Sequence, residues 1–223
     1  MNKSNGKNVP RVAVITGGHP FDVPNFHKFF RAIKDADIYI QHMDEFASSD
    51  EKTRNSYDAV LFYIMLIDVP SDDNVPGYAG KPKSALENLT KTGQAIFILH
   101  HAILAYPKWD LWNDLVGINK REFGYHPDQN VHINISKKNH PIVKGLKDWD
   151  MPDETYTMDN ADEGSEILLT ADHPKSMKTI AWTRKCGKSR VFCLQSGHDN
   201  LTWENPNFAE VVRRGIQWCA GRL

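Results

Sequence analysis

Histidine is the residue type through which this sequence is best equipped to do chemistry. Ten of the 223 residues are histidines, and imidazole both titrates near neutral pH and serves as a common metal ligand. Four of the ten occur in three short polar segments, at residues 17–22 (GGHPFD), 100–101 (HH) and 196–200 (SGHDN). Each segment directly follows an apolar run, which is where a strand is expected to end.

The apolar runs predict buried strands at residues 11–16, 57–66, 94–99 and 190–195. A shorter strand and four helices complete this pattern: the strand at residues 38–41 and the helices at residues 25–34, 81–92, 109–116 and 207–219. Alternation of strand and helix indicates a doubly wound α/β fold, in which helices cover both faces of a mostly parallel sheet.

The second half of the chain departs from this alternation. Strands are predicted at residues 131–135, 167–170 and 179–183 with few helices between them, so we expect a β-rich, antiparallel extension of the parallel core. No linker divides the sequence. We therefore expect a flexible polar tail at residues 1–8 and a single domain at residues 9–223.

The three polar segments are expected to meet, because ligands of open α/β sheets bind outside the carboxyl ends of the parallel strands. The candidate site residues at these strand ends are His19, Asp22, His100, His101, His198, Asp199 and Asn200. A single loop histidine is usually only solvent-exposed, but three clusters at one sheet edge predict a shared crevice.

The sequence offers no obvious nucleophile at this crevice. The turn that would carry Ser or Cys in a nucleophile elbow carries His100 and His101 instead. Cys193 falls inside a predicted strand, so its thiol is expected to be packed. Acid–base or metal-assisted chemistry is therefore favoured over a covalent intermediate.

His19, His100 and His198 could bind a divalent metal such as zinc, since imidazole is a frequent zinc ligand. There is no HExxH or paired-Cys motif, so a metal-free polar site fits the sequence equally well. Gly17 and Gly18 do not form a GxGxxG or Walker pattern, so no nucleotide cofactor is expected.

The middle region supplies further candidates that could reach the crevice as a lid. Glu154 and Tyr156 lie in the segment DETY, and His126 lies in REFGYH. Trp203, after SGHDN, could stack on a sugar ring, although aromatic side chains more often pack in the core.

The charge balance and amino-acid composition of the chain narrow the classes of partner that it is expected to bind. Lys and Arg number 27 against 28 Asp and Glu, with no basic stripe, so nucleic acid is not expected as a partner. No apolar run suits a membrane span or a signal peptide, and three scattered cysteines favour the cytoplasm. An exposed patch around Trp109 and Trp112 would indicate a homo-oligomer.

Most of the chain from Val9 onward resembles the ThuA-like, or trehalose-utilisation, family. The matching segments, in order, are GGHPFD, QAIFILHHAI, HPIVKGL, DETY and SGHDN with the Trp203 region and the following helix. This family belongs to the class I glutamine amidotransferase-like superfamily, so the resemblance implies a flavodoxin-like fold.

The resemblance also implies which chemistry is lost. His100 stands where the amidotransferase Cys would be, and His198-Asp199-Asn200 stands where a His-x-Glu would complete the triad. Glutamine hydrolysis is therefore not expected. The family implies a role in the metabolism of trehalose, related disaccharides or keto-sugars, and it adds support for a divalent metal.

Three hypotheses remain open. In the first, an enzyme acts on a carbohydrate, with His100, His198, Asp199 and Glu154 catalytic. The remaining site residues then bind substrate; they are Asp22, His101, His126, Tyr156, Asn200 and Trp203. In the second, the chain is a non-catalytic sugar-binding or regulatory module. The third, a zinc-dependent hydrolase of sugar derivatives, is the weakest, since GGHPFD lacks a second Asp.

Overall fold

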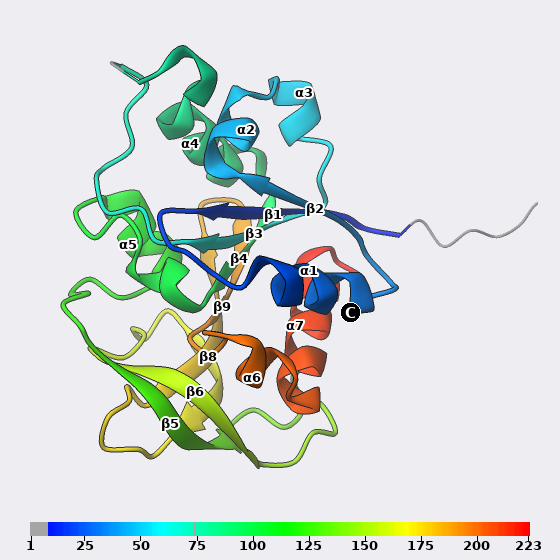
Figure 1. Ribbon diagram of the computed structural model, residues 1–223, viewed down its shortest axis with the longest axis vertical. Coiled ribbons are helices and arrows are strands. Elements are labelled where there is room, and N and C mark those ends of the chain that lie inside the picture. The colour runs from blue at the N-terminus through cyan, green and yellow to red at the C-terminus, as the bar shows by residue number, and fades with distance from the viewer. Residues whose placement is uncertain (1–8, 74) are drawn as a thin grey trace, which may run out of the picture.

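The computed structural model describes residues 9–73 and 75–223, and its centre is one mixed sheet of nine strands (Figure 1). The expected tail at residues 1–8 lies outside the described residues. The strand order across the sheet is β2-β1-β3-β4-β9-β8-β7-β5-β6. In chain order the strands are β1 (Arg11–Gly17), β2 (Asp37–His42), β3 (Ala59–Ile64), β4 (Ala95–Leu99), β5 (Gly124–Ile135), β6 (Trp149–Thr157), β7 (Glu166–Ala171), β8 (Thr179–Cys186) and β9 (Ser189–Leu194).

Helices cover both faces of the parallel part of this sheet. The α-helices are α1 (Val23–Ala32), α2 (Met43–Ser48), α3 (Glu51–Arg54), α4 (Pro82–Thr92), α5 (Asp110–Val116), α6 (Asn200–Trp203) and α7 (Pro206–Cys219), and the 3₁₀ turns are η1 (Gly77–Ala79) and η2 (His100–Leu104). One apolar core lies under α1 and α7, and a second lies under α2, α4 and α5. Figure 1 shows α2 and α4 above strand β1 and α1 and α7 below it.

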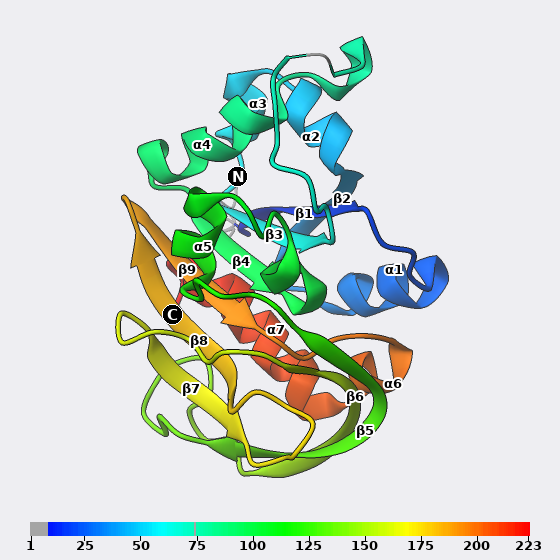
Figure 2. The same cartoon turned by 90° about the vertical axis from the view of Figure 1, so that its left-hand side faces the viewer.

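The expected fold class is confirmed. Strands β2, β1, β3, β4 and β9 pair in parallel, while β8, β7, β5 and β6 continue the sheet by antiparallel pairing. The antiparallel strands form the β-rich extension, in which β5 and β6 curve together beneath α6 and α7 (Figure 2). Parallel strands buried on both faces read as continuous apolar runs, which is why they were visible in the sequence.

The sequence prediction missed several elements. Strand β6 was not among the predicted strands, and β5 begins seven residues before the expected start at 131. The short helices α2, α3 and α6 were also missed, because helices of four to six residues show too little periodicity. Trp109 and Trp112 are buried, so they form no exposed patch for a second copy.

Residue choice at the start of α1 explains how the first strand-end loop is held. The Asp22 carboxylate accepts a hydrogen bond from the Asn25 backbone N–H at 3.2 Å, as an N-cap does. Just before it, Gly18 has φ +75°, and a Cβ at this position would lie 2.5 Å from the Met65 carbonyl oxygen. Only glycine fits here, so the loop that carries His19 is fixed against the end of β3.

The buried guanidinium of Arg121 stabilises the η2 turn that follows β4. Arg121 is 5% exposed and donates hydrogen bonds to the backbone oxygens of Ile103, Ala105 and Tyr106 and to the Asn113 side chain. Burial lowers its pKa to about 10, which leaves it charged at neutral pH.

Within the described residues the helices are too short or too polar to cross a lipid bilayer.

Replacing Arg121 by Met should therefore destabilise the fold, because several buried carbonyl oxygens lose their donor. We expect the free energy of unfolding to fall by about 3 kcal/mol, since each buried unsatisfied polar group costs about 1–3 kcal/mol. Urea denaturation followed by tryptophan fluorescence measures the change. The control Arg31→Met, at an exposed position of α1, should change stability by less than about 0.5 kcal/mol; an equal loss in both variants would contradict this role.

Candidate functional site

His100 is the first residue after β4 and lies at the centre of the candidate site. It is fully buried and has φ +53°, an uncommon backbone conformation for a residue other than glycine. Its Nδ1 lies 2.7 Å from the Gln195 backbone oxygen at the end of β9. A carbonyl oxygen only accepts, so Nδ1 carries a proton, and Nε2 is turned toward the side chains of β6.

Two side chains of β6 face this nitrogen. The Tyr156 hydroxyl lies 2.8 Å from His100 Nε2, and Glu154 Oε1 lies 3.5 Å from it. Burial opposes ionisation of Glu154, but hydrogen bonding to His100 and the charges of His100 and His198 outweigh burial, so the pKa of this carboxyl is lowered. Burial raises the pKa of Tyr156 well above its ordinary value, which keeps its hydroxyl protonated as a donor.

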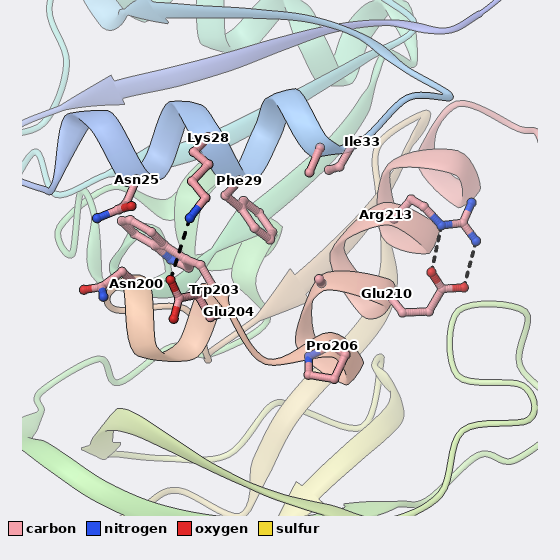
Figure 3. Close-up of a pocket in the computed structure, with 12 residues that line it drawn as sticks. Asn25, Lys28, Phe29, Ile33, Asn200, Trp203, Glu204, Pro206, Glu210 and Arg213 are labelled. Atoms are coloured by element: carbon pink, nitrogen blue, oxygen red, sulfur yellow. Dashed lines mark hydrogen bonds and ion pairs between the residues drawn. The ribbon is translucent and has the colours of Figure 1, made fainter.

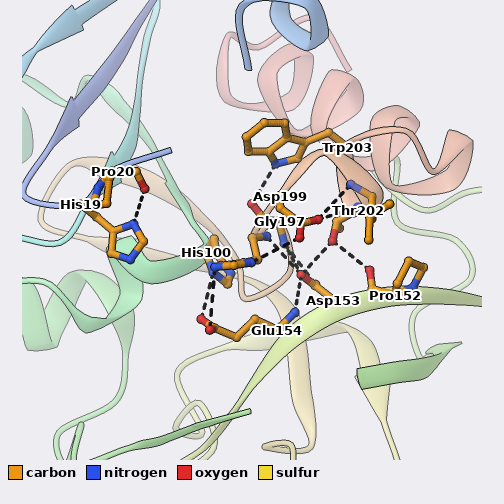
Figure 4. Close-up of polar contacts among 12 residues, drawn as sticks. His19, Pro20, His100, Pro152, Asp153, Glu154, Gly197, Asp199, Thr202 and Trp203 are labelled. Carbon is orange, nitrogen blue, oxygen red and sulfur yellow. Dashed lines mark hydrogen bonds and ion pairs between the residues drawn. The ribbon is translucent and has the colours of Figure 1, made fainter. Parts of the chain in front are cut away.

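His198 approaches the same carboxylate from the loop after β9. Its Nε2 lies 3.8 Å from Glu154 Oε2, and its Nδ1 lies 3.6 Å from Asp199 Oδ2. The His198 and His100 rings are 5.4 Å apart, centroid to centroid. Glu154 therefore lies between two imidazoles, with one carboxylate oxygen toward each (Figure 4).

Asp153 holds the loop that carries His198. Its buried carboxylate accepts hydrogen bonds from the backbone N–H groups of Gly197 and His198 and from the Thr202 hydroxyl, at 3.0–3.3 Å. Burial raises the pKa of Asp153, opposed by the positive charge of His100 and by these N–H donors. Because Asp153 and Glu154 are adjacent, one strand supplies both the support of His198 and its carboxylate partner.

His101 and His19 form a second pair of rings beside this centre. His101 Nδ1 lies 3.0 Å from the Ile64 backbone oxygen at the end of β3, and the His19 and His101 centroids are 4.6 Å apart. Burial, together with the charges of His100 and His19, lowers the pKa of His101 to about 2, so this ring is neutral in the working range of pH. The Tyr63 ring packs against His101 at 4.2 Å.

One three-residue set among the described residues has the spacing of a metal site. Donor atoms of His100, Glu154 and His198 all lie within 4.8 Å of one another. The predicted ligand set contained His19 in place of Glu154. His19 instead turns its Nδ1 to the Pro20 backbone oxygen at 2.7 Å and packs on His101, so it lies outside this set, in which Glu154 is the third member.

Several predicted substrate-binding residues lie outside this cluster. Trp203 is 4% exposed, donates to the Gly197 backbone oxygen and packs against Phe26, so little of its ring is open to a ligand. Asn200 opens helix α6 and lines a groove with Trp203. Asp22 caps α1, and His126 lies 3.3 Å from the Thr157 hydroxyl on the β5–β6 ribbon.

Sequence reasoning missed three residues that hold the site together. They are Asp153, Gln195 and Tyr63, whose hydroxyl donates to the His198 backbone oxygen at 2.9 Å. Asp153 follows Trp149 and Met151 at every second position, and this alternation is the signal that could have revealed β6. The contacts of Tyr63 and Gln195 depend on sheet order, and no local pattern encodes them.

A groove of about 380 Å³ lies between α1, α6 and α7, and none of the residues that line it is a histidine (Figure 3). Its floor is apolar and includes Phe29, Ile33 and Trp203. Charged groups at its rim pair with one another, as Lys28 with Glu204 and Arg213 with Glu210. Polar groups do not converge inside it, so we place the chemistry at the strand ends.

The cysteines contribute no nucleophile to the site. Cys193 is buried inside β9, and burial raises the pKa of its thiol. Cys219 is likewise buried on α7, and Cys186 lies at the far end of β8. The residue at the strand-to-turn position that would hold a nucleophile is His100, as expected.

The sequence and the fold place this chain in a protein family. The family model for ThuA, described as trehalose utilisation, matches residues 11–219. The chain therefore belongs to the ThuA family. No curated protein matches the sequence.

Solved structures with the same fold include members of this family and glutamine amidotransferases. A protein of Parabacteroides merdae described as ThuA-like is 20% identical with a TM-score of 0.73, covering 95% of this chain and 90% of its own. A second ThuA-like protein, from Bacteroides uniformis, is 14% identical with a TM-score of 0.69, covering 98% and 95%. A glutamine amidotransferase of Thermotoga maritima is 11% identical with a TM-score of 0.55, covering 95% and 98%.

Replacing Asp153 by Asn tests whether this carboxylate positions His198. The new amide group faces N–H donors where an oxygen accepted them, so we expect a loss of about 2 kcal/mol in the free energy of unfolding. Urea denaturation measures that loss, and histidine side-chain NMR signals report the displacement of His198. The matched control is Asp150→Asn on the same strand, whose carboxylate is exposed; equal effects at both positions would rule out a special role for Asp153.

Proposed function

We propose that this ThuA family member is an enzyme that acts on a carbohydrate at the His100–Glu154–His198 cluster. The observation that carries the proposal is the Glu154 carboxylate between two imidazoles, 3.5 Å from His100 Nε2 and 3.8 Å from His198 Nε2. The family's description as trehalose utilisation supports trehalose, a related disaccharide or a keto-sugar derivative as the substrate.

The residues support acid–base chemistry without a covalent enzyme intermediate. The lowered pKa of Glu154 keeps it ionised, so its carboxylate can accept a proton from a substrate hydroxyl or a water molecule. His198 is half-buried and can exchange protons with solvent, whereas His100 is fully buried. We assign proton transfer to Glu154 and His198, and the positioning of Glu154 to His100 and Tyr156.

The same three donors favour a metal-assisted form of this chemistry. Two imidazoles and one carboxylate match the three-ligand sets of catalytic zinc sites. His100 donates its Nδ1 proton to a backbone oxygen, the orienting contact that metal-bound histidines usually make. To free the Nε2 lone pair, the Tyr156 hydroxyl must turn away from His100. A divalent ion at these donors would polarise a substrate oxygen.

We place the protein in the cytoplasm, with a small carbohydrate as its partner. Cys186, Cys193 and Cys219 are free thiols, which supports a reducing compartment, the cytoplasm. The partner is a small carbohydrate, with neither nucleic acid nor membrane. The near balance of charge, with a net value of -1, supports this choice.

Replacing Glu154 by Gln should abolish turnover while leaving the fold intact, because the amide has nearly the same shape but accepts no proton. We expect the rate to fall about 10²–10⁴-fold, the usual contribution of a positioned acid–base group. Trehalose, other disaccharides and their keto-sugar derivatives are incubated with the protein, and anomeric ¹H NMR signals report any product.

The control for this variant is Glu163→Gln, in the exposed loop between β6 and β7. It should retain full activity. Undiminished turnover in Glu154→Gln would overturn the assignment of Glu154. Calorimetric sugar binding without product at long incubation would instead identify a non-catalytic binding module.

Metal analysis decides between the two forms of the chemistry. In the metal-assisted form, protein purified without chelator holds about one zinc ion per chain, and His198→Ala loses it because one of three ligands is gone. Inductively coupled plasma mass spectrometry measures the ratio of metal to protein. The control variant His132→Ala, on an exposed face of β5, should keep the ion. Full activity in metal-free wild-type protein would rule out the metal-assisted form and leave acid–base chemistry as the mechanism.

A further inference from the structure

His101 carries a buried hydrogen-bond acceptor that the cluster described above does not use. Its Nδ1 is bound to the Ile64 backbone oxygen, so the proton lies on Nδ1 and Nε2 presents a lone pair. Nε2 is buried and has no hydrogen-bond partner among the described residues. Buried polar atoms nearly always have a partner, so an unpaired acceptor beside a candidate site indicates a group supplied by a ligand.

His19 presents a second acceptor of the same kind. Its Nδ1 is directed at the Pro20 backbone oxygen at 2.7 Å, which again leaves the lone pair on Nε2. The His19 and His101 ring centroids are 4.6 Å apart, so the two rings pack against each other and form one patch. Of the rings packed on His101, those of Tyr63 and His100 are buried while that of His19 is half-exposed. Rotation of the His19 side chain is thus the way to Nε2 of His101.

Three carboxylates lie in the site beside this patch and disfavour an anionic ligand. Glu154 contacts both His100 and His198, and Asp199 contacts His198. Asp153 accepts from the His198 backbone N–H. Burial raises the pKa of Tyr63, and the negative charges of these three carboxylates raise it further, so they act on the ring that packs against His101. Hydroxyl groups suit such a surface, because each can donate a hydrogen bond without carrying negative charge.

We propose that Nε2 of His101, together with Nε2 of His19, accepts hydrogen bonds from hydroxyls of an uncharged polyol, and that the site thereby selects unphosphorylated sugars over sugar phosphates. The inference rests on the proposed carbohydrate function and adds to it the charge class of the substrate and a specificity residue. His101 acts on the substrate's hydroxyls, while proton transfer stays with Glu154 and His198.

Binding of matched sugar pairs tests this inference. Isothermal titration calorimetry compares trehalose with trehalose 6-phosphate, and glucose with glucose 6-phosphate, on the intact chain. Wild-type protein should bind the neutral member of a pair at least about tenfold more tightly. His101→Phe keeps the ring shape without the acceptor and should weaken binding of the neutral sugar about tenfold, the loss of one hydrogen bond of about 1.4 kcal/mol. His101→Gln, whose amide oxygen can accept, should recover part of the affinity.

The control is His132→Phe on β5, which should bind as wild type does. Long-range ¹H–¹⁵N NMR of the wild-type protein provides a measurement that needs no substitution: the unprotonated Nε2 signal of His101 should shift when trehalose is added. Equal binding of the phosphorylated sugars, unchanged affinity in His101→Phe, an unmoved Nε2 signal or no binding of any neutral sugar would each overturn the inference. Sugar binding without turnover would instead remove the enzymatic proposal and leave this one standing.

Discussion

The arrangement of this site depends on backbone carbonyl oxygens at the ends of two strands. Gln195 and Ile64 each accept the Nδ1 proton of a buried histidine, His100 and His101 respectively. Each bond fixes both the tautomer and the direction of its ring, because a carbonyl can only accept. Two adjacent residues thus point their Nε2 lone pairs at different places, and those places are set by the order of the strands. The rigid sheet provides this precision, which loops alone would not.

The antiparallel strands β5 and β6 complete the site, because β6 supplies side chains that contact the histidines at the ends of the parallel strands. Strand β6 lies at the edge of the sheet, so it can carry Pro152 without losing a needed ladder hydrogen bond. Its successive residues then face different partners: Asp153 holds the backbone at His198, while Glu154 and Tyr156 reach His100. A shift of register in β6 by one residue would separate all of these contacts. The β-rich extension is therefore part of the site.

How far the sequence predicts this molecule depends on whether a feature is local. Residues at the ends of the parallel strands, such as His100 and His198, could be placed together because continuous apolar runs reveal buried parallel strands and their ends converge. Glu154 was assigned to the same site as a lid residue, but its contact with both imidazoles depends on the place of β6 at the edge of the sheet, which has no local signal in the sequence. Trp203 shows the opposite error: its position after a polar loop suggested an open aromatic face, but α6 turns the ring into the core against Phe26.

The comparison with amidotransferases gives the strained turn at His100 a physical meaning. A positive φ directly after a buried strand is the backbone of a nucleophile elbow, which presents one side chain above the sheet. Here the same backbone presents an imidazole, and His198 faces two carboxylates, Glu154 from β6 and Asp199 from its own loop. Strain at such a position costs of order 1–3 kcal/mol and is retained where the surroundings enforce it. With an imidazole at the elbow, that strain holds the ring so that its Nε2 lies beside Tyr156 and Glu154.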